Sequence, residues 1–120
     1  MKVLVADKFE KVGLDGLAAL GCEVVNEPGA GASGLGEALA KHGPDVLIVR
    51  SSKVTPEVMA RGTTLRVIIR AGAGVDNIDV GSATSRNIKV CNTPGMNAVA
   101  VAELTMGLLL CCDRRLPEQC

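Results

Sequence analysis

The sequence predicts a doubly wound α/β fold with one parallel five-stranded sheet, and three observations support this prediction. Five short runs rich in β-branched residues begin 20 to 23 residues apart, which leaves room for one helix between each pair. The 120 residues are 48% hydrophobic with a single Phe and neither Trp nor Tyr, so the core must be aliphatic, as in a parallel sheet covered by helices. Helix signals fill the intervals between the runs. Right-handed crossovers then give the strand order 2-1-3-4-5 most simply.

The predicted strands are KVLVA (2–6), EVVN (23–26), VLIVR (46–50), RVIIR (66–70) and KVCN (89–92). Helices are predicted between them at residues 9–20, 35–43 and 80–87 and from Pro56 onward. The predicted apolar face of the first helix consists of Phe9, Val12, Leu17 and Leu20. Gly21 is a natural stop for that helix, because glycine readily adopts the left-handed conformation at a C-terminus. Thr55 is a good helix cap, since Pro and an acidic residue follow it directly.

A further long helix is predicted over residues 97–116, and it differs from the others. Its apolar residues are distributed around nearly the whole circumference of the helix, whereas a helix on the surface of a small domain needs only one apolar stripe. We therefore expect residues 1–96 to form one domain and this helix to be covered by a second domain or a partner subunit. The alternative is an unusually apolar surface helix.

Composition excludes several classes of function. Thirteen basic and thirteen acidic residues cancel, and with a single aromatic residue the chain has no surface suited to nucleic acid. The five cysteines show no metal-ligand spacing, and their odd number indicates reduced thiols and a cytoplasmic location. No metal site is predicted. The chain opens directly on a strand without a signal peptide, and its longest apolar stretch, 98–112, is too short to span a bilayer.

The turn in RVIIRAGAGVDNID (66–79) raises the question of a cofactor site. A dinucleotide fingerprint needs a third glycine and an acid about 20 residues further on. Asn77 stands at the third glycine position, and Asn92 stands where the acid is needed. The turn nevertheless offers backbone N–H groups at the carboxyl end of a strand, and two arginines, Arg50 and Arg70, end neighbouring strands. An anion site for carboxylate or phosphate is predicted there; solvated strand ends beside a simple turn remain the alternative.

Other chemistries common on this fold do not fit. A phosphorelay receiver needs an aspartate ending the third strand and a lysine ending the fifth, where this chain has Arg50 and Asn92. The segment after the first strand is not the Ser/Thr/Gly-rich loop that a flavin phosphate requires. His42, the one histidine, lies near a helix end, away from the strand ends, so no hydrolase triad can be assembled around it.

Four blocks in order carry a resemblance to a known family: VLIVRSSKV (46–54), RVIIRAGAGVDNID (66–79), NTPGMNAVAVAELTMGLLL (92–110) and RRLPEQ (114–119). Together they resemble the N-terminal part of the NAD-dependent D-2-hydroxyacid dehydrogenases, most closely the members that oxidise 3-phosphoglycerate. The resemblance implies an oxidoreductase, and for this chain a substrate-binding domain of flavodoxin-like fold that takes a small anionic substrate.

The resemblance also implies roles for individual residues. Those that would hold the substrate's carboxylate and phosphate are Arg50, Ser51, Gly72, Ala73, Gly74 and Val75. Arg70 would assist with the phosphate, and Asn97 and Val101 would face the nicotinamide side of the cleft. The helix over 97–116 would cross to the cofactor domain and form a homodimer. Ser52 stands where the family more often has Ala.

The resemblance further implies that the full-length parent uses NAD to oxidise 3-phosphoglycerate to 3-phosphohydroxypyruvate in serine biosynthesis. The family's catalytic Arg, Glu and His and its cofactor domain have no counterpart in these 120 residues. The chain alone is therefore expected to be catalytically incomplete and to bind no cofactor. The alternative is a stand-alone α/β anion-binding or oligomerisation module without catalysis.

Overall fold

The computed structural model describes residues 1–31, 34–115 and 118, and it confirms the predicted sheet. The strands are β1 (Lys2–Val5), β2 (Glu23–Asn26), β3 (Val46–Val49), β4 (Val67–Arg70) and β5 (Lys89–Cys91). The helices between them are α1 (Lys11–Ala19), α2 (Leu35–His42), α3 (Pro56–Arg61) and α4 (Val80–Ser85). All neighbouring strands are parallel, in the order β2-β1-β3-β4-β5. One helix in each crossover therefore produces the doubly wound α/β topology.

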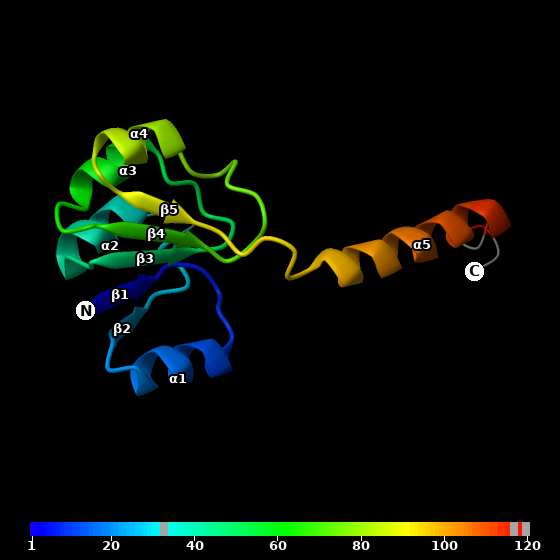
Figure 1. Cartoon of the computed structure of the whole chain (residues 1–120), viewed down its shortest axis with the longest axis horizontal. Coiled ribbons are helices and arrows are strands. Elements are labelled where there is room, and N and C mark those ends of the chain that lie inside the picture. The colour runs from blue at the N-terminus through cyan, green and yellow to red at the C-terminus, as the bar shows by residue number, and fades with distance from the viewer. Residues whose placement is uncertain (32–33, 116–117, 119–120) are drawn as a thin grey trace.

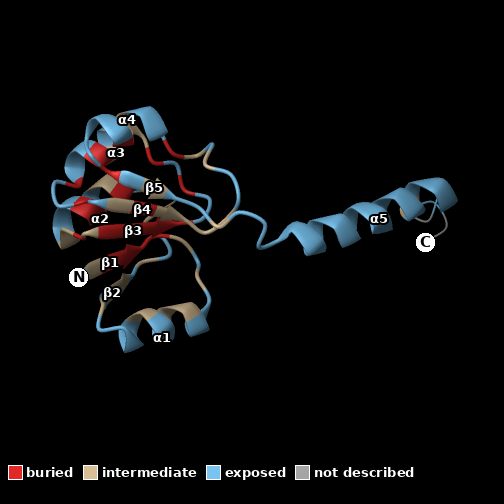
Figure 2. Ribbon diagram, viewed as in Figure 1, coloured by how far each residue is buried: buried red, intermediate tan, exposed pale blue. Residues whose placement is uncertain are grey.

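The helices cover the two faces of the sheet unequally. Figure 1 shows α2, α3 and α4 on one face and α1 on the other. On the three-helix face, Leu4, Leu47 and Ile68 of the central strands are fully buried. The buried cluster on the other face is smaller. It consists of Val3, Val5, Val46 and Ile48, which pack with residues of α1 and the segment before it. All four residues of β3 are buried because this central strand is covered on both sides (Figure 2).

The predicted face of the first helix is wrong in part. Val12 and Leu20 are 80% and 81% exposed, whereas Leu14 and Leu17 pack against the sheet together with Phe9. The physical reason is that the helix begins only at Lys11, so the pair three residues apart, Leu14 and Leu17, shares the inward side. The predicted stop is confirmed, because Gly21 has a φ of +84° directly after the last turn.

Local signals for the other helices are confirmed. The Thr55 hydroxyl accepts a hydrogen bond from the Val58 N–H at 3.3 Å, and Pro56 is the first helical residue. The apolar stripe of α2, Leu35, Ala38 and Leu39, is buried. Helix α4 ends at Ser85, two residues before the predicted end, because Asn87 adopts a positive φ of +58° that no helix can continue through.

The C-terminal helix requires a correction. Helix α5 (Ala98–Arg114) extends away from the sheet, as Figures 1 and 2 show, and none of its residues is buried. In this structure the helix is therefore not the covered apolar element that was predicted: Val99, Leu104 and Leu109 are 72%, 64% and 59% exposed. The reason is that no second layer faces it, since the sheet and its own four helices complete the compact part of the fold. Residue 116, where the predicted helix ends, and Cys120 lie outside the described residues. In the described ranges, no helix has the length and apolarity needed to cross a membrane.

Candidate functional site

The loops that follow β1, β3, β4 and β5 meet at the carboxyl edge of the sheet. This edge is where open parallel sheets bind their ligands, because the loops there are free to diverge from the rigid strands. A cavity of about 550 Å³ opens between the last three of these loops. Its lining residues are Arg50, Arg70, Ala71, Gly72, Ala73, Gly74, Thr93, Met96 and Asn97.

Asp7, two residues after the end of β1, organises the loop after β3. Its Oδ2 accepts hydrogen bonds from the backbone N–H groups of Arg50, Ser51 and Ser52, at 2.7, 3.0 and 3.0 Å. Its other oxygen accepts from the Ser52 hydroxyl. Burial by itself raises the pKa of Asp7, but the hydrogen bonds from the Ser52 hydroxyl and the three N–H groups outweigh it, so the pKa lies below its usual value. We call residues 50–52 the Arg50 loop.

Arg70, at the end of β4, holds the Arg50 loop from the opposite side. Its Nε donates to the Arg50 carbonyl at 2.9 Å, and its Nη1 donates to the Gly74 carbonyl at 3.0 Å. The guanidinium can fold back this way only because residue 72 has no side chain: a Cβ at Gly72 would overlap it. Arg70 thus joins the Arg50 loop to the glycine turn.

Two asparagines complete the hydrogen bonding between the loops. The Asn77 side chain donates to the Ser52 carbonyl at 2.7 Å, and the backbone carbonyl of Asn77 accepts from the Val54 N–H at 2.8 Å. The Asn92 side chain donates to the Ala73 carbonyl at 2.6 Å. Asn77 therefore fixes the glycine turn to the Arg50 loop, which explains why a side chain stands where a dinucleotide fingerprint has its third glycine.

Several donors at the cavity remain open. Among the described residues, the Arg50 guanidinium has no hydrogen-bond or ion-pair partner, and the backbone N–H groups of Ala73 and Gly74 have none either. A guanidinium and two N–H groups around one cavity favour a carboxylate or phosphate group as ligand, since each can donate to an anionic oxygen.

Most residues predicted for the site line this cavity, and some do not. Arg50, Arg70, Gly72, Ala73, Gly74 and Asn97 line it. Ser51 instead lines a neighbouring cavity of about 480 Å³ together with Asp7. Val75 belongs to neither, and Val101 lies on the exposed helix α5, away from the sheet.

Reasoning from sequence missed the positioning side chains Asp7, Asn77 and Asn92. A signal was present, because Asp7 and Asn77 lie in segments that follow a predicted strand at the carboxyl edge, and Asn92 is the last residue of another. What the sequence could not show is which backbone groups they meet.

The glycine turn does not fit a dinucleotide. In a fingerprint the turn leads directly into a helix whose N-terminus receives the pyrophosphate. Here α4 begins only at Val80, after Asp79 has capped it, and the Arg70 guanidinium covers Gly72. The described residues likewise contain no group of three or more His, Cys, Asp or Glu side chains placed to hold a metal ion.

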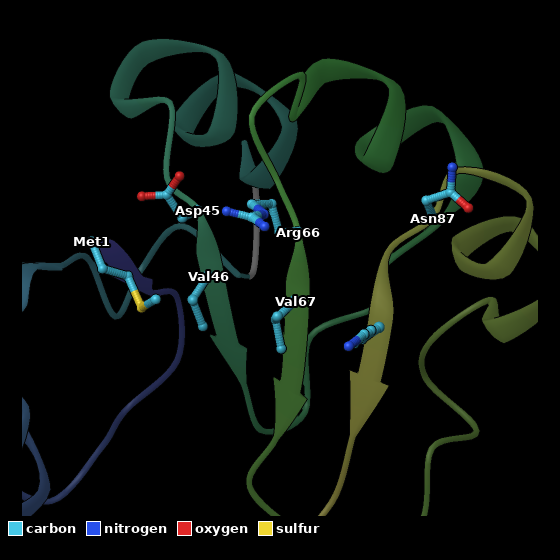
Figure 3. Close-up of a pocket in the computed structure, with 7 residues that line it drawn as sticks. Met1, Asp45, Val46, Arg66, Val67 and Asn87 are labelled. Carbon is cyan, nitrogen blue, oxygen red and sulfur yellow. The ribbon is translucent and has the colours of Figure 1, made fainter.

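Figure 3 shows a second cavity, of about 540 Å³, at the opposite, amino edge of the sheet. Its lining residues are Met1, Asp45, Val46, Arg66, Val67, Asn87 and Lys89. Arg66 and Lys89 are exposed, and the Asp45 carboxylate already accepts the Lys2 N–H at 2.9 Å. None of the predicted site residues lies there. The candidate site is therefore the cavity at the carboxyl edge.

Comparison with known proteins places this site in a family. Residues 3–107 match the model of the D-isomer specific 2-hydroxyacid dehydrogenase catalytic domain. A D-3-phosphoglycerate dehydrogenase of Archaeoglobus fulgidus is 39% identical over 98% of this chain and 22% of its own length. A hydroxypyruvate reductase of Thermotoga maritima is 55% identical over 60% of this chain and 24% of its own length.

A solved structure agrees with these matches. The NAD+-bound 3-phosphoglycerate dehydrogenase of Entamoeba histolytica superimposes with a TM-score of 0.80 at 36% identity, over 92% of this chain and 38% of that one. This chain thus spans less than a quarter of the length of the two curated relatives named above. The match over nearly all of its described residues shows that the chain belongs to the D-isomer specific 2-hydroxyacid dehydrogenase family, whose members are oxidoreductases.

Proposed function

We propose that this chain provides the substrate-binding domain of an NAD-dependent 2-hydroxyacid dehydrogenase, with residues 1–96 as the domain and 97–116 as a helix joining it to the cofactor domain. The proposed substrate is 3-phosphoglycerate, which the full-length enzyme would oxidise to 3-phosphohydroxypyruvate in serine biosynthesis, in the cytoplasm. The observation that carries this proposal is the cavity at the carboxyl edge, where Arg50 and the N–H groups of Ala73 and Gly74 are open to an anion. The choice of substrate is supported by the names of two relatives reported above, the D-3-phosphoglycerate dehydrogenase of Archaeoglobus fulgidus and the 3-phosphoglycerate dehydrogenase of Entamoeba histolytica.

The geometry suits binding and orientation. 3-Phosphoglycerate has a carboxylate at one end and a phosphate at the other. The Arg50 guanidinium can hold one of these groups with two parallel hydrogen bonds, while the turn at Ala73 and Gly74 donates to the other. Arg70 lines the same cavity and adds positive charge, although two of its N–H groups already bind loop carbonyls. NAD would accept the hydride; we place its binding site and the proton acceptor outside these 120 residues.

An NMR titration tests the proposal. Adding 3-phosphoglycerate to the 15N-labelled chain should shift the amide signals of residues 50–52 and 72–75, with D-glycerate, which lacks the phosphate, binding more weakly. Arg50→Gln should abolish the shifts, and Arg66→Gln, an exposed arginine at the amino edge, is the matched control. Shifts confined to the amino edge, or unchanged by Arg50→Gln, would contradict the assignment. NAD-dependent turnover by the chain alone would contradict the placement of catalysis outside it.

We further propose that α5 mediates a homodimer. Val101, Leu104 and Leu108 recur at helical spacing and are 52%, 64% and 56% exposed, and apolar side chains grouped on one exposed side of a helix favour association with a partner. Sedimentation velocity should show a dimer that the double substitution Leu104→Lys and Leu108→Lys converts to a monomer. Glu103→Lys, an exposed charged position on the same helix, should leave it dimeric. A wild-type monomer with the helix formed would contradict this proposal.

A further inference from the structure

The three consecutive N–H groups of the Arg50 loop converge on one oxygen. All three point to Oδ2 of Asp7, at 2.7 to 3.0 Å. Successive backbone N–H groups that converge in this way form a concavity that binds anions, which is the feature expected of a substrate site at this edge. Here the concavity already contains an anion, and that anion belongs to the chain itself.

The carboxylate is enclosed by two further residues. Ser52 is 6% exposed, and its hydroxyl donates to the second oxygen of Asp7. Gly31, from the segment after β2, passes so close that a Cβ there would overlap both the Asp7 carboxylate and the Ser52 hydroxyl. The Gly31 N–H in turn donates to the Ala6 carbonyl at 3.0 Å. Asp7 is therefore half-buried and closely surrounded by Ser52, Gly31 and the Arg50 loop.

Two backbone carbonyls of the loop also accept hydrogen bonds from side chains. The Arg50 carbonyl accepts from Arg70, and the Ser52 carbonyl accepts from Asn77. The backbone of the Arg50 loop is thus held by three side chains from three different segments, and no strand or helix pairing supports it. Of these three, only Asp7 binds N–H groups, and it binds three of them.

We propose that Asp7 is a positioning residue for the substrate site. By filling the concavity of the Arg50 loop, its carboxylate keeps free anions out of that place and fixes the loop so that the Arg50 side chain lines the cavity. A substrate carboxylate or phosphate then meets the Arg50 side chain and the turn at Ala73 and Gly74, not the loop N–H groups. The identity of the ligand in this inference rests on the proposed function. The claim that Asp7 fixes the conformation of the Arg50 loop does not.

Asp7→Ala in the full chain tests this proposal through two separate measurements. The first is the order of the loop, read from amide hydrogen exchange and 15N relaxation of residues 50–52. The second is affinity for 3-phosphoglycerate and for inorganic phosphate. We expect loss of exchange protection at all three amides and a dissociation constant for 3-phosphoglycerate raised at least tenfold. Formate, a free carboxylate small enough for the vacated place, should restore both.

Two variants serve as controls. Asp45→Asn changes an aspartate of similar partial exposure that caps one N–H at the opposite edge, and it should leave both measurements unchanged. Asp7→Asn preserves side-chain size and provides the answer if Asp7→Ala fails to fold, since it retains only one acceptor oxygen.

The outcomes separate the inference from the proposed function. Unchanged protection and affinity in the Asp7 variants would overturn the positioning role. A second outcome combines two results: formate restores the exchange protection lost in Asp7→Ala, and the wild type binds neither 3-phosphoglycerate nor phosphate. This outcome would support the role of Asp7 in fixing the loop and would refute the proposed substrate. Formate restoring stability to urea but neither loop order nor affinity would show a merely structural role and overturn the inference.

Discussion

Replacing Arg70 by methionine tests whether one side chain holds the two site loops together. The substitution keeps an unbranched chain of similar reach and removes the donors that bind the Arg50 carbonyl at 2.9 Å and the Gly74 carbonyl at 3.0 Å. Hydrogen bonds from a charged donor contribute about 1.5–3 kcal/mol each when buried. Both of these lie at an exposed position, where water competes and replaces the lost partner, so roughly 0.5–1 kcal/mol each is the better figure.

Arg70→Met should therefore lower the free energy of unfolding by about 1–2 kcal/mol, a substantial part of the ~5–15 kcal/mol typical of a small domain. In urea, with a slope of about 2 kcal/mol per molar from the middle of the usual range, the unfolding midpoint should fall by roughly 0.5–1 M. The dissociation constant for 3-phosphoglycerate should rise about tenfold, because the Arg50 loop and the glycine turn would lose their fixed separation.

Arg70→Lys distinguishes the geometry from the charge. Lysine keeps the positive charge but lacks the planar fork that reaches two carbonyls at once, so it should behave nearly like methionine in urea and in loop order. Arg86→Met, at an exposed arginine at the end of α4, is the control and should change neither quantity. If Arg70→Lys matches the wild type in stability and affinity, the clamp is not the role of this residue and only its charge matters.

Three further substitutions test the Asp7 site and the core. Burial raises the pKa of Asp7, but its hydrogen bonds lower it by more, so the folded pKa lies below the unfolded one. The Asp7 carboxylate therefore stabilises the fold above its unfolded pKa, and this contribution is lost as the pH falls through its folded pKa. Urea titrations between about pH 6 and about pH 2 should show a steeper acid loss in the wild type than in Asp7→Asn, and equal slopes would contradict this. Gly31→Ala should destabilise the fold by about 1–3 kcal/mol through overlap with Asp7 and Ser52, whereas Gly29→Ala, where a Cβ meets nothing within 4 Å, should be nearly neutral; thermal unfolding of the pair decides. Ile68→Ala, at a fully buried position of β4, should cost about 2–5 kcal/mol in denaturant unfolding, against less than about 0.5 kcal/mol for Val12→Ala on the exposed side of α1.

Much of the fold could be predicted because its signals are local. The spacing of β-branched runs, the Thr55 cap and the Gly21 stop each depend on residues adjacent in sequence, and the structure confirms all three. The face of α1 was predicted incorrectly because it depends on the residue at which the helix begins. The state of α5 could not be read from its composition, since exposure depends on what other parts of a protein are present to cover it.

The sequence by itself determined the strand order, the aliphatic core and the edge at which Arg50, Arg70 and the glycine turn lie. It also excluded a dinucleotide fingerprint, through Asn77. Only the tertiary structure decided how these groups contact one another. Asp7 accepts hydrogen bonds from the N–H groups of the Arg50 loop, and Arg70 donates hydrogen bonds to two loop carbonyls. The physical reason is that the bonds of Asp7 to the Arg50 loop and of Arg70 to the Arg50 carbonyl join residues 20 to 45 positions apart, and their geometry exists only once parallel strands bring the loop ends to one edge.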